Sequence, residues 1–183
     1  MTEQALPLTD DDWPILTNLL VKLANTQPWR PETYEALARC VVNPAIETVI
    51  WRRGPAHGEL QFFLAHRPTK EEQPSEPFPE MLAGLGTIFR KTDARETDPR
   101  IAFARLEERE LKPARFKYPP ELAALRLVND PARGVFLCCI HLAEIKGTPA
   151  KGKFYPAQPL PDNLVPSHRD IILPTAFKVL EEK

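Results

Sequence analysis

The segment 98–113, DPRIAFARLEERELKP, brings together the carboxylates of this chain that are best spaced for chemistry. It carries three glutamates: Glu107, Glu108 and Glu110. Asp98 suits the N-cap of a helix and Pro99 its first turn, whereas Pro113 cannot continue one, so we expect a helix between them. Carboxylates on one face of a helix can bind a hard cation such as Mg²⁺, which takes oxygen ligands.

The spacing of these acids places two of them on one face of a helix and the third on the opposite side. In an α-helix Glu107 and Glu110 lie about 60° apart, close enough to share a cation, and Glu108 points to the far side beside Lys112. We therefore predict Glu107 and Glu110 as catalytic and metal-binding residues, with Glu96 in the preceding loop as a third metal ligand. The alternative interpretation is a solvated helix face with no metal.

The elements that must position these residues begin with an N-terminal helical extension. Residues 10–25 have acidic caps and leucines at helical spacing, and a second short helix is expected at 32–41. We assign residues 1–44 to this extension and 45–183 to the main domain. A leucine-rich helix usually packs into a core, but this one is also suited to a homodimer contact.

The main domain begins with alternating, β-branched segments. Residues 46–52 and 59–66 are expected to form a hairpin, and residues 67–80, rich in proline and charge, a surface loop. Further elements are expected beyond the acidic helix: strands at 124–128, 135–144 and near 154–155, and a helix from 168 to 181 that Pro174 kinks or restarts. This order predicts an α/β (α+β) fold with a mixed or antiparallel sheet between helices.

The composition excludes several classes of protein. An apolar fraction of 43% is sufficient for a core, and a net charge of −1 argues against a nucleic-acid or anionic-membrane partner. No apolar run approaches the roughly 18 residues of a transmembrane helix, and the acidic N-terminus does not resemble a signal peptide. The three cysteines, Cys40, Cys138 and Cys139, have no metal-ligand spacing and are expected as reduced thiols. We therefore expect a cytoplasmic protein.

Two parts of the sequence resemble the Nudix superfamily of pyrophosphate-bond hydrolases. The first is the tail, where Phe154-Tyr155-Pro156 and Leu160-Pro161 lead into an apolar helix near His168. The second is the hairpin IETVIWRRG…ELQFFLAHRP, which precedes a glycine-containing segment and the acidic helix. The resemblance covers about residues 45–180. It implies a Nudix-like α/β/α sandwich that follows the helical extension.

The diagnostic Nudix motif is degenerate in this sequence. Arg109-Glu110-Leu111 reproduces its Arg-Glu-aliphatic triplet, but Pro113 and Ala114 then stand where a Glu-Glu pair belongs. The earlier glutamate of the motif falls at Ile101. Shifting the register to Arg105 does not restore the pattern, because Leu106 then occupies the main glutamate position.

The resemblance leaves two classes of function open. One is a Nudix-fold protein with weak or absent pyrophosphohydrolase activity that binds a nucleotide-like phosphate compound or a partner. The other is a divergent hydrolase of a nucleoside diphosphate linked to another group, which uses Mg²⁺ or Mn²⁺. In either class Arg67, Arg90 and Tyr155 are candidate substrate-binding residues. Arg90 is suited to phosphates and Tyr155 to stacking on a base, and Arg67 ends a strand near the place where the resemblance implies a substrate cleft.

Overall fold

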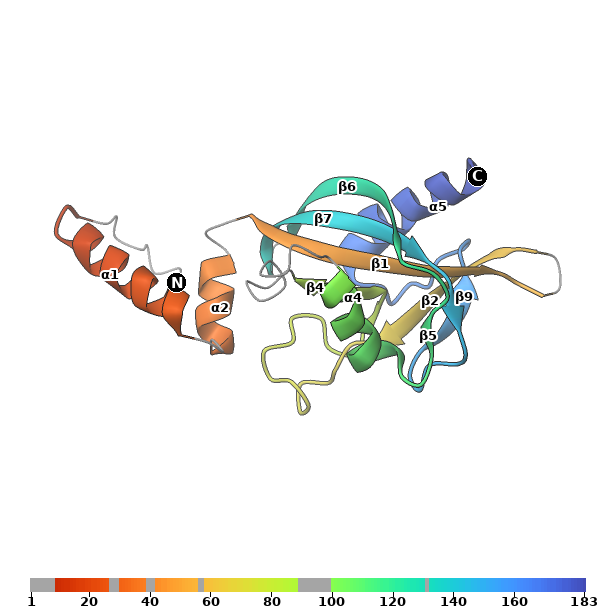
Figure 1. Ribbon diagram of the computed structural model, residues 1–183, viewed down its shortest axis with the longest axis horizontal. Coiled ribbons are helices and arrows are strands. Elements are labelled where there is room, and N and C mark those ends of the chain that lie inside the picture. Colours follow the sequence, from red (N-terminus) through yellow and green to blue (C-terminus); the bar gives the residue numbers. More distant parts are fainter. Residues whose placement is uncertain (1–8, 27–29, 39–41, 56–57, 89–99, 131) are drawn as a thin grey trace. The chain divides into compact units, whose positions relative to one another are not determined.

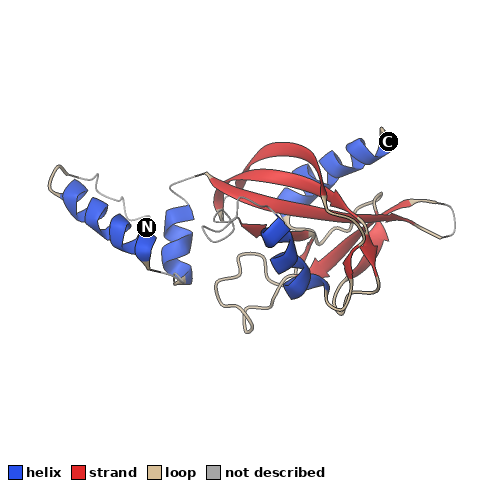
Figure 2. Ribbon diagram, in the orientation of Figure 1, coloured by secondary structure: helices blue, strands red, loops and turns tan. Residues whose placement is uncertain are grey.

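The computed structural model describes residues 9–26, 30–38, 42–55, 58–88, 100–130 and 132–183. The chain divides into two units, Met1–Leu37 and Ala38–Lys183. Figure 1 traces both units, and Figure 2 shows that helices dominate the first and strands the second.

The first unit is helical, as the sequence predicts. Its first helix is α1 (Asp12–Asn25), and the second, α2 (Pro31–Ala38), ends at the boundary between the two units. Asp12 stabilises the start of α1, because its carboxylate accepts hydrogen bonds from the backbone N–H and the hydroxyl of Thr9. Large apolar side chains of α1 remain exposed: Trp13, Ile15, Leu19, Leu20 and Val21. No helix in the described ranges is both long enough and apolar enough to span a membrane.

The second unit is built on a mixed sheet. The strands run in the order β3-β2-β1-β7-β6, with β4 also paired to β1 and β9 to β2. The pairing of β1 with β7 is parallel and the others are antiparallel, so the prediction of a mixed sheet is confirmed. The strands are β1 (Asn43–Arg53), β2 (Leu60–His66), β3 (Leu82–Ala83), β4 (Leu85–Ile88), β6 (Glu121–Asp130), β7 (Gly134–Ala143) and β9 (Lys153–Pro156). A separate two-stranded sheet joins β5 (Arg115–Phe116) to β8 (Ile145–Lys146).

Helices cover both faces of the sheet, which gives an α/β/α sandwich (Figure 1). One face carries α4 (Arg100–Leu106) and its continuation η1 (Glu107–Leu111), a π-helical turn. The other face carries a second π-helical turn, η2 (His168–Ile172), followed by α5 (Leu173–Glu181). The sequence predicts a kink or a restart at Pro174. The helix does not restart there, because Ile172 and Leu173 keep helical backbone angles and η2 continues directly into α5. The irregularity next to the proline is the wider π-helical turn η2 that precedes it.

Alternation along β1 fixes which side chains face which layer. Ala45 and Val49 belong to the core beneath η2 and α5, whereas Ile46 and Ile50 pack with residues of α4 and η1. Successive side chains of a strand point to opposite faces, so Glu47 shares the η2 and α5 side with its odd-numbered neighbours.

Two segments differ from the sequence-based expectation. The acidic segment was expected as one α-helix, but its last five residues form the π turn η1, in which hydrogen bonds run from i to i+5 and the turn is wider. The loop 67–80 was expected at the surface, yet Glu76 within it is fully buried. Its charge is retained inside because two arginines neutralise it.

Candidate functional site

Glu107, the first of the predicted metal ligands, is bound to the backbone of a neighbouring strand. Its Oε2 accepts a hydrogen bond from the backbone N–H of Phe116 in β5 at 2.8 Å. The side chain is half-buried, and this contact fixes the end of the acidic helix against the small β5–β8 sheet. One carboxylate oxygen of Glu107 therefore has a structural role.

Glu110 and Glu108 lie at the surface. Glu110 is 41% exposed and its carboxylate lies 3.8 Å from Arg109, whereas Glu108 forms the predicted ion pair with Lys112. Because η1 is π-helical, the i, i+3 spacing of Glu107 and Glu110 does not give the separation of about 60° expected for an α-helix.

The described acids do not fit the divalent ion that a Nudix fold implies. Within the described ranges no three His, Cys, Asp or Glu side chains gather closely enough to hold a metal ion. Glu96 and Arg90 lie outside the described residues, so their predicted roles in metal and phosphate binding stay predictions. The assignment of Glu107 and Glu110 as catalytic ligands also stays a prediction.

Arg67, a predicted substrate-binding residue, is held by the buried Glu76. Its guanidinium lies 2.5 Å from Glu76 Oε2, and Arg133 approaches Oε1 at 3.1 Å from the β6–β7 turn. The backbone N–H of Phe78 donates a third hydrogen bond to the same carboxylate. Burial alone would raise the pKa of Glu76, but Arg67, Phe78 and Arg133 together hold it below its ordinary value of 4.5. Arg67 thus fastens the 67–80 loop to the domain.

Tyr155, the predicted base-stacking residue, is part of β9. It pairs with Phe62 of β2 and packs, partly buried, against the core on the α5 side of the sheet. Lys153 Nζ lies 4.9 Å from the centre of its ring. A role in substrate binding remains a prediction for this tyrosine.

A pair of buried polar side chains that the sequence analysis did not select lies in the centre of the domain. Glu47 comes from the middle of β1 and His168 from the start of η2. Glu47 Oε2 lies 3.3 Å from His168 Nε2, and the two side chains are only 16% and 7% exposed. The pair joins the sheet to η2.

Two glycines make room for this pair. A Cβ atom on Gly86 would lie 2.6 Å from Glu47 Oε2, and a Cβ on Gly84 would lie 3.2 Å from the His168 ring. Gly86 stands opposite Glu47 in the β1–β4 register, so the carboxylate extends over a strand position that has no side chain. Because Gly84 and Gly86 have no side chains, no Cβ atom occupies the space beside the carboxylate and the imidazole at these two positions.

The polar atoms of the pair are not satisfied by the described residues. Glu47 Oε2 and both ring nitrogens of His168 are buried without a partner in hydrogen-bond geometry among the described residues. Buried polar groups are nearly always hydrogen-bonded, so the carboxylate and the imidazole retain donor and acceptor capacity that a bound molecule can use. Burial, and then the charge of Glu47, raise the pKa of the nearby Cys138 to about 12, which keeps that thiol neutral.

From the sequence, a capping or packing role for His168 is favoured over a catalytic one, and Glu47 is not selected. The turn η2 has no side-chain cap, so His168 does not cap it. The signal in the sequence was the single charge of Glu47 inside the run Ile46–Ile50, which is otherwise suited to a buried strand.

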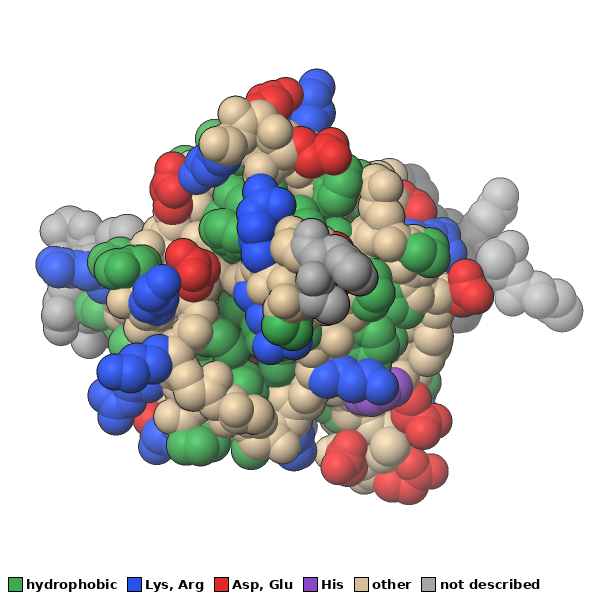
Figure 3. Space-filling model, turned by 90° about the vertical axis from the view of Figure 1, so that its right-hand side faces the viewer, with side chains coloured by type: hydrophobic (Ala, Val, Ile, Leu, Met, Phe, Trp, Pro, Cys, Tyr) green, Lys and Arg blue, Asp and Glu red, His purple; other side chains and the backbone are tan. Residues whose placement is uncertain are grey.

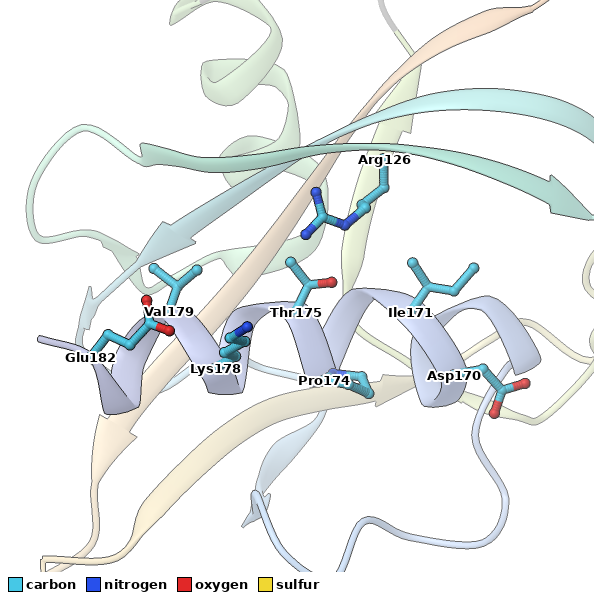
Figure 4. A pocket seen from close by; sticks show the side chains of 8 residues that line it. All are labelled: Arg126, Asp170, Ile171, Pro174, Thr175, Lys178, Val179 and Glu182. Carbon is cyan, nitrogen blue, oxygen red and sulfur yellow. The ribbon is translucent and has the colours of Figure 1, made fainter.

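A groove of about 550 Å³ lies elsewhere, between β6 and the C-terminal helix (Figure 4). Arg126 extends from β6 towards α5, and charges of both signs line the groove together with apolar side chains. Its Asp170 is already paired with Arg169 at 2.8 Å. Because no buried unpartnered polar atom lines this groove among the described residues, we place the candidate site at Glu47 and His168.

The surface around the tip of the β1–β2 hairpin carries charges of both signs. Figure 3 shows this face, where basic and acidic side chains are interspersed with apolar ones. The mixture agrees with the net charge of −1.

Comparison with known proteins identifies the fold. No protein-family model and no curated protein matches the sequence. Solved structures do match. A MutT NUDIX hydrolase from Burkholderia pseudomallei has 18% identity and a TM-score of 0.56, and the match covers 74% of this chain and 98% of the other. The NUDIX domain of NrtR from Shewanella oneidensis, complexed with ADP ribose, has 15% identity and a TM-score of 0.51, with coverage of 94% and 99%.

A third match is a domain whose structure was solved in complex with another protein. The C-terminal domain of mouse MUTYH, in complex with human PCNA, has 10% identity and a TM-score of 0.52, with coverage of 78% and 89%. At these identities the likeness is one of fold alone. The chain therefore has the Nudix fold, as the sequence resemblance predicts.

Proposed function

We propose that this protein binds a nucleotide-like phosphate compound at Glu47 and His168, and that its pyrophosphohydrolase activity is weak or absent. The observation that carries this proposal is the buried, unsatisfied pair itself, flanked by two glycines. A buried carboxylate and imidazole are costly unless something completes their hydrogen bonds. A ligand that supplies N–H and O–H donors would do so.

The chemistry of the pair limits what the ligand offers. A carboxylate only accepts hydrogen bonds, and an imidazole donates one and accepts one when neutral. The amino groups of a nucleobase and the hydroxyls of a ribose match that set. The NrtR NUDIX domain, which has the same fold, is complexed with ADP ribose, and this supports a nucleoside diphosphate derivative as the ligand class.

Weak hydrolysis follows from the state of the acidic helix. Glu107 is bonded to Phe116 and Glu110 lies at the surface beside Arg109. Metal-dependent hydrolysis needs a cation held firmly enough to polarise a phosphate or activate a water. The described acids do not supply such a cluster.

A metal-dependent hydrolase of a nucleoside diphosphate linked to another group is the second candidate. It is supported by the hydrolase among the structures of the same fold. In that case Mg²⁺ or Mn²⁺ would be held by Glu107, Glu110 and Glu96.

The test is calorimetric titration with ADP, ADP-ribose and related compounds, beside measurement of phosphate-product release with Mg²⁺ or Mn²⁺. We expect binding without turnover, and at least tenfold weaker binding in Glu47→Gln and His168→Asn. Glu108→Gln, which alters only a surface ion pair, is the matched control and should bind normally. Turnover that disappears in Glu107→Gln and Glu110→Gln would instead establish the hydrolase. Equal affinity in wild type and Glu47→Gln would overturn the proposed binding site.

A further inference from the structure

The strand β6 lies at the end of the sheet and exposes three leucines. Among the described strands it pairs only with β7, so its other edge presents unpaired backbone groups (Figure 1). Leu122, Leu125 and Leu127 are 53%, 53% and 67% exposed. A long apolar edge strand usually pairs with another chain unless it is blocked.

The sequence of this edge is nearly its own mirror image. Residues 121–126 read Glu-Leu-Ala-Ala-Leu-Arg. If two copies pair antiparallel about an axis between Ala123 and Ala124, Glu121 stands opposite Arg126 and Leu122 opposite Leu125. Opposite charges and apolar pairs at facing positions both stabilise antiparallel strands, whereas like charges destabilise them.

A β-bulge makes this pairing geometrically consistent. In a regular strand Leu122 and Leu125 would point to opposite faces, but the register with β7 slips between Leu122 and Ala124. As a result Leu122 lies opposite His141 and Leu125 opposite Cys139, which share one face of β7. Facing residues of an antiparallel pair must lie on the same side of the sheet, and the two leucines do.

The charged residues meet the same condition on the other face. Glu121 lies opposite Leu142 and Arg126 opposite Cys138, whose side chains both belong to the core on the α5 side. Figure 4 shows Arg126 extending towards α5, and Glu121 is paired at 2.7 Å with Lys183 beyond the end of α5. A bulge ordinarily discourages pairing at an edge, but here the axis passes through it, so it recurs symmetrically in both copies.

From this symmetry we propose that β6 pairs antiparallel with β6 of a second copy, which joins the two sheets into one across a two-fold axis. The interface is isologous: Glu121 of each chain binds Arg126 of the other, and Leu122 packs on Leu125. This surface is independent of the ligand site at Glu47 and His168.

Charge reversal tests the pairing. Sedimentation velocity over a concentration series should show a wild-type dimer, and Glu121→Arg or Arg126→Glu alone should raise its dissociation constant about tenfold, because each places two like-charged pairs opposite one another. The double variant Glu121→Arg/Arg126→Glu should return the constant to near the wild-type value. A monomeric wild type, or single variants that dimerise normally, would overturn the proposal. So would a dimer that is lost in Leu19→Glu of α1 but unaffected by the reversals.

Disulfide trapping provides a second, independent measurement. In a Cys139→Ser background, which removes the free thiol opposite position 125, Leu122→Cys/Leu125→Cys should yield a covalent dimer under mild oxidation. Each new cysteine faces the other position of the second copy and cannot reach its own chain's partner three residues away. In the same background, Leu122→Cys alone, which faces Leu125, is the control and should remain monomeric on non-reducing gels. Equal cross-linking of both variants would refute the register.

Discussion

The carboxylate of Glu107 accepts a hydrogen bond from the backbone N–H of Phe116 at 2.8 Å, so this acid joins the acidic helix to β5. Glu110, three residues later, pairs only with its neighbour Arg109 in the described structure, at 3.8 Å. The two glutamates lie in the same helical turn, but we expect Glu107 to contribute more to the stability of the fold than Glu110. The difference can be measured without any ligand.

Removing these two side chains should have unequal effects on stability. Glu107→Ala leaves a partly buried N–H without its acceptor, and we expect the free energy of unfolding to fall by about 1–3 kcal/mol. Glu110→Ala removes a weak surface pair and should change it by no more than about 0.5 kcal/mol. Urea denaturation followed by circular dichroism gives both values. Equal losses in the two variants would contradict the assigned role of Glu107.

Adding a methyl group at Gly86 should disturb the ligand site. The new Cβ would lie 2.6 Å from Glu47 Oε2, so the carboxylate must rotate away from His168. We expect Gly86→Ala to weaken ligand binding at least tenfold and to lower the free energy of unfolding by about 1 kcal/mol. Titration calorimetry and urea denaturation measure the two effects.

Gly54→Ala is the matched control for that experiment. A Cβ there would crowd the carboxylate of Glu59, which belongs to the β1–β2 hairpin and not to the site. Gly54→Ala should bind ligand with unchanged affinity. If both substitutions weaken binding equally, crowding at Glu47 is not the cause.

The buried Glu76 should make stability depend on acid pH. Its pKa in the folded protein is lower than the ordinary value of 4.5, so the unfolded chain binds the proton more tightly. This contribution to stability is present above pH about 4.5 and is lost as the pH falls through the lower, folded pKa. Glu76→Gln leaves two arginines without their charge partner, and we expect it to cost about 3–5 kcal/mol at neutral pH.

Denaturation curves from neutral pH to pH about 3 test this contribution. The wild-type protein should lose more stability over that range than Glu76→Gln, because only the wild type has this carboxylate to protonate. Parallel pH profiles for the two proteins would show that Glu76 is not held in its charged form by Arg67 and Arg133.

The thiol of Cys138 should resist alkylation in the folded protein. Burial, the charge of Glu47, and the neighbouring Cys139 and Asp130 raise its pKa to about 12, so the reactive thiolate is rare at pH about 8. We expect iodoacetamide to leave Cys138 unmodified until denaturant is added. Peptide mass spectrometry of Cys139→Ser, in which Cys138 is the sole thiol of its peptide, provides the readout. Rapid modification of the native protein would contradict the burial of this thiol.

Much of the fold could be predicted from the sequence because the patterns are local. The β1–β2 hairpin and the β6–β7 pair follow from alternation and turn residues. The π turn at the end of the acidic helix could not be predicted, since it depends on how Leu111 and Glu107 contact residues that are distant in the sequence.

The candidate site depended on contacts that the sequence does not state. Glu47 and His168 are far apart along the chain and meet only because η2 packs over β1. The space that the two side chains occupy depends on Gly84 and Gly86, which the sequence indicates only as breaks in an apolar segment. The burial of Glu76 escaped notice for the same reason, because Arg133 reaches it from the turn between β6 and β7.

The parallel pairing of β1 with β7 sets the order in which this domain can be completed during synthesis. Asn43 is aligned with Phe136 and Ile50 with Ala143. The central strand β1 is therefore synthesised long before β7, the strand with which it pairs in parallel. The β1–β2 hairpin can form as soon as it leaves the ribosome, but one edge of β1 remains open until β7 follows. That open edge is the part of the nascent chain most exposed to wrong association, and it is where chaperone contact would be most useful.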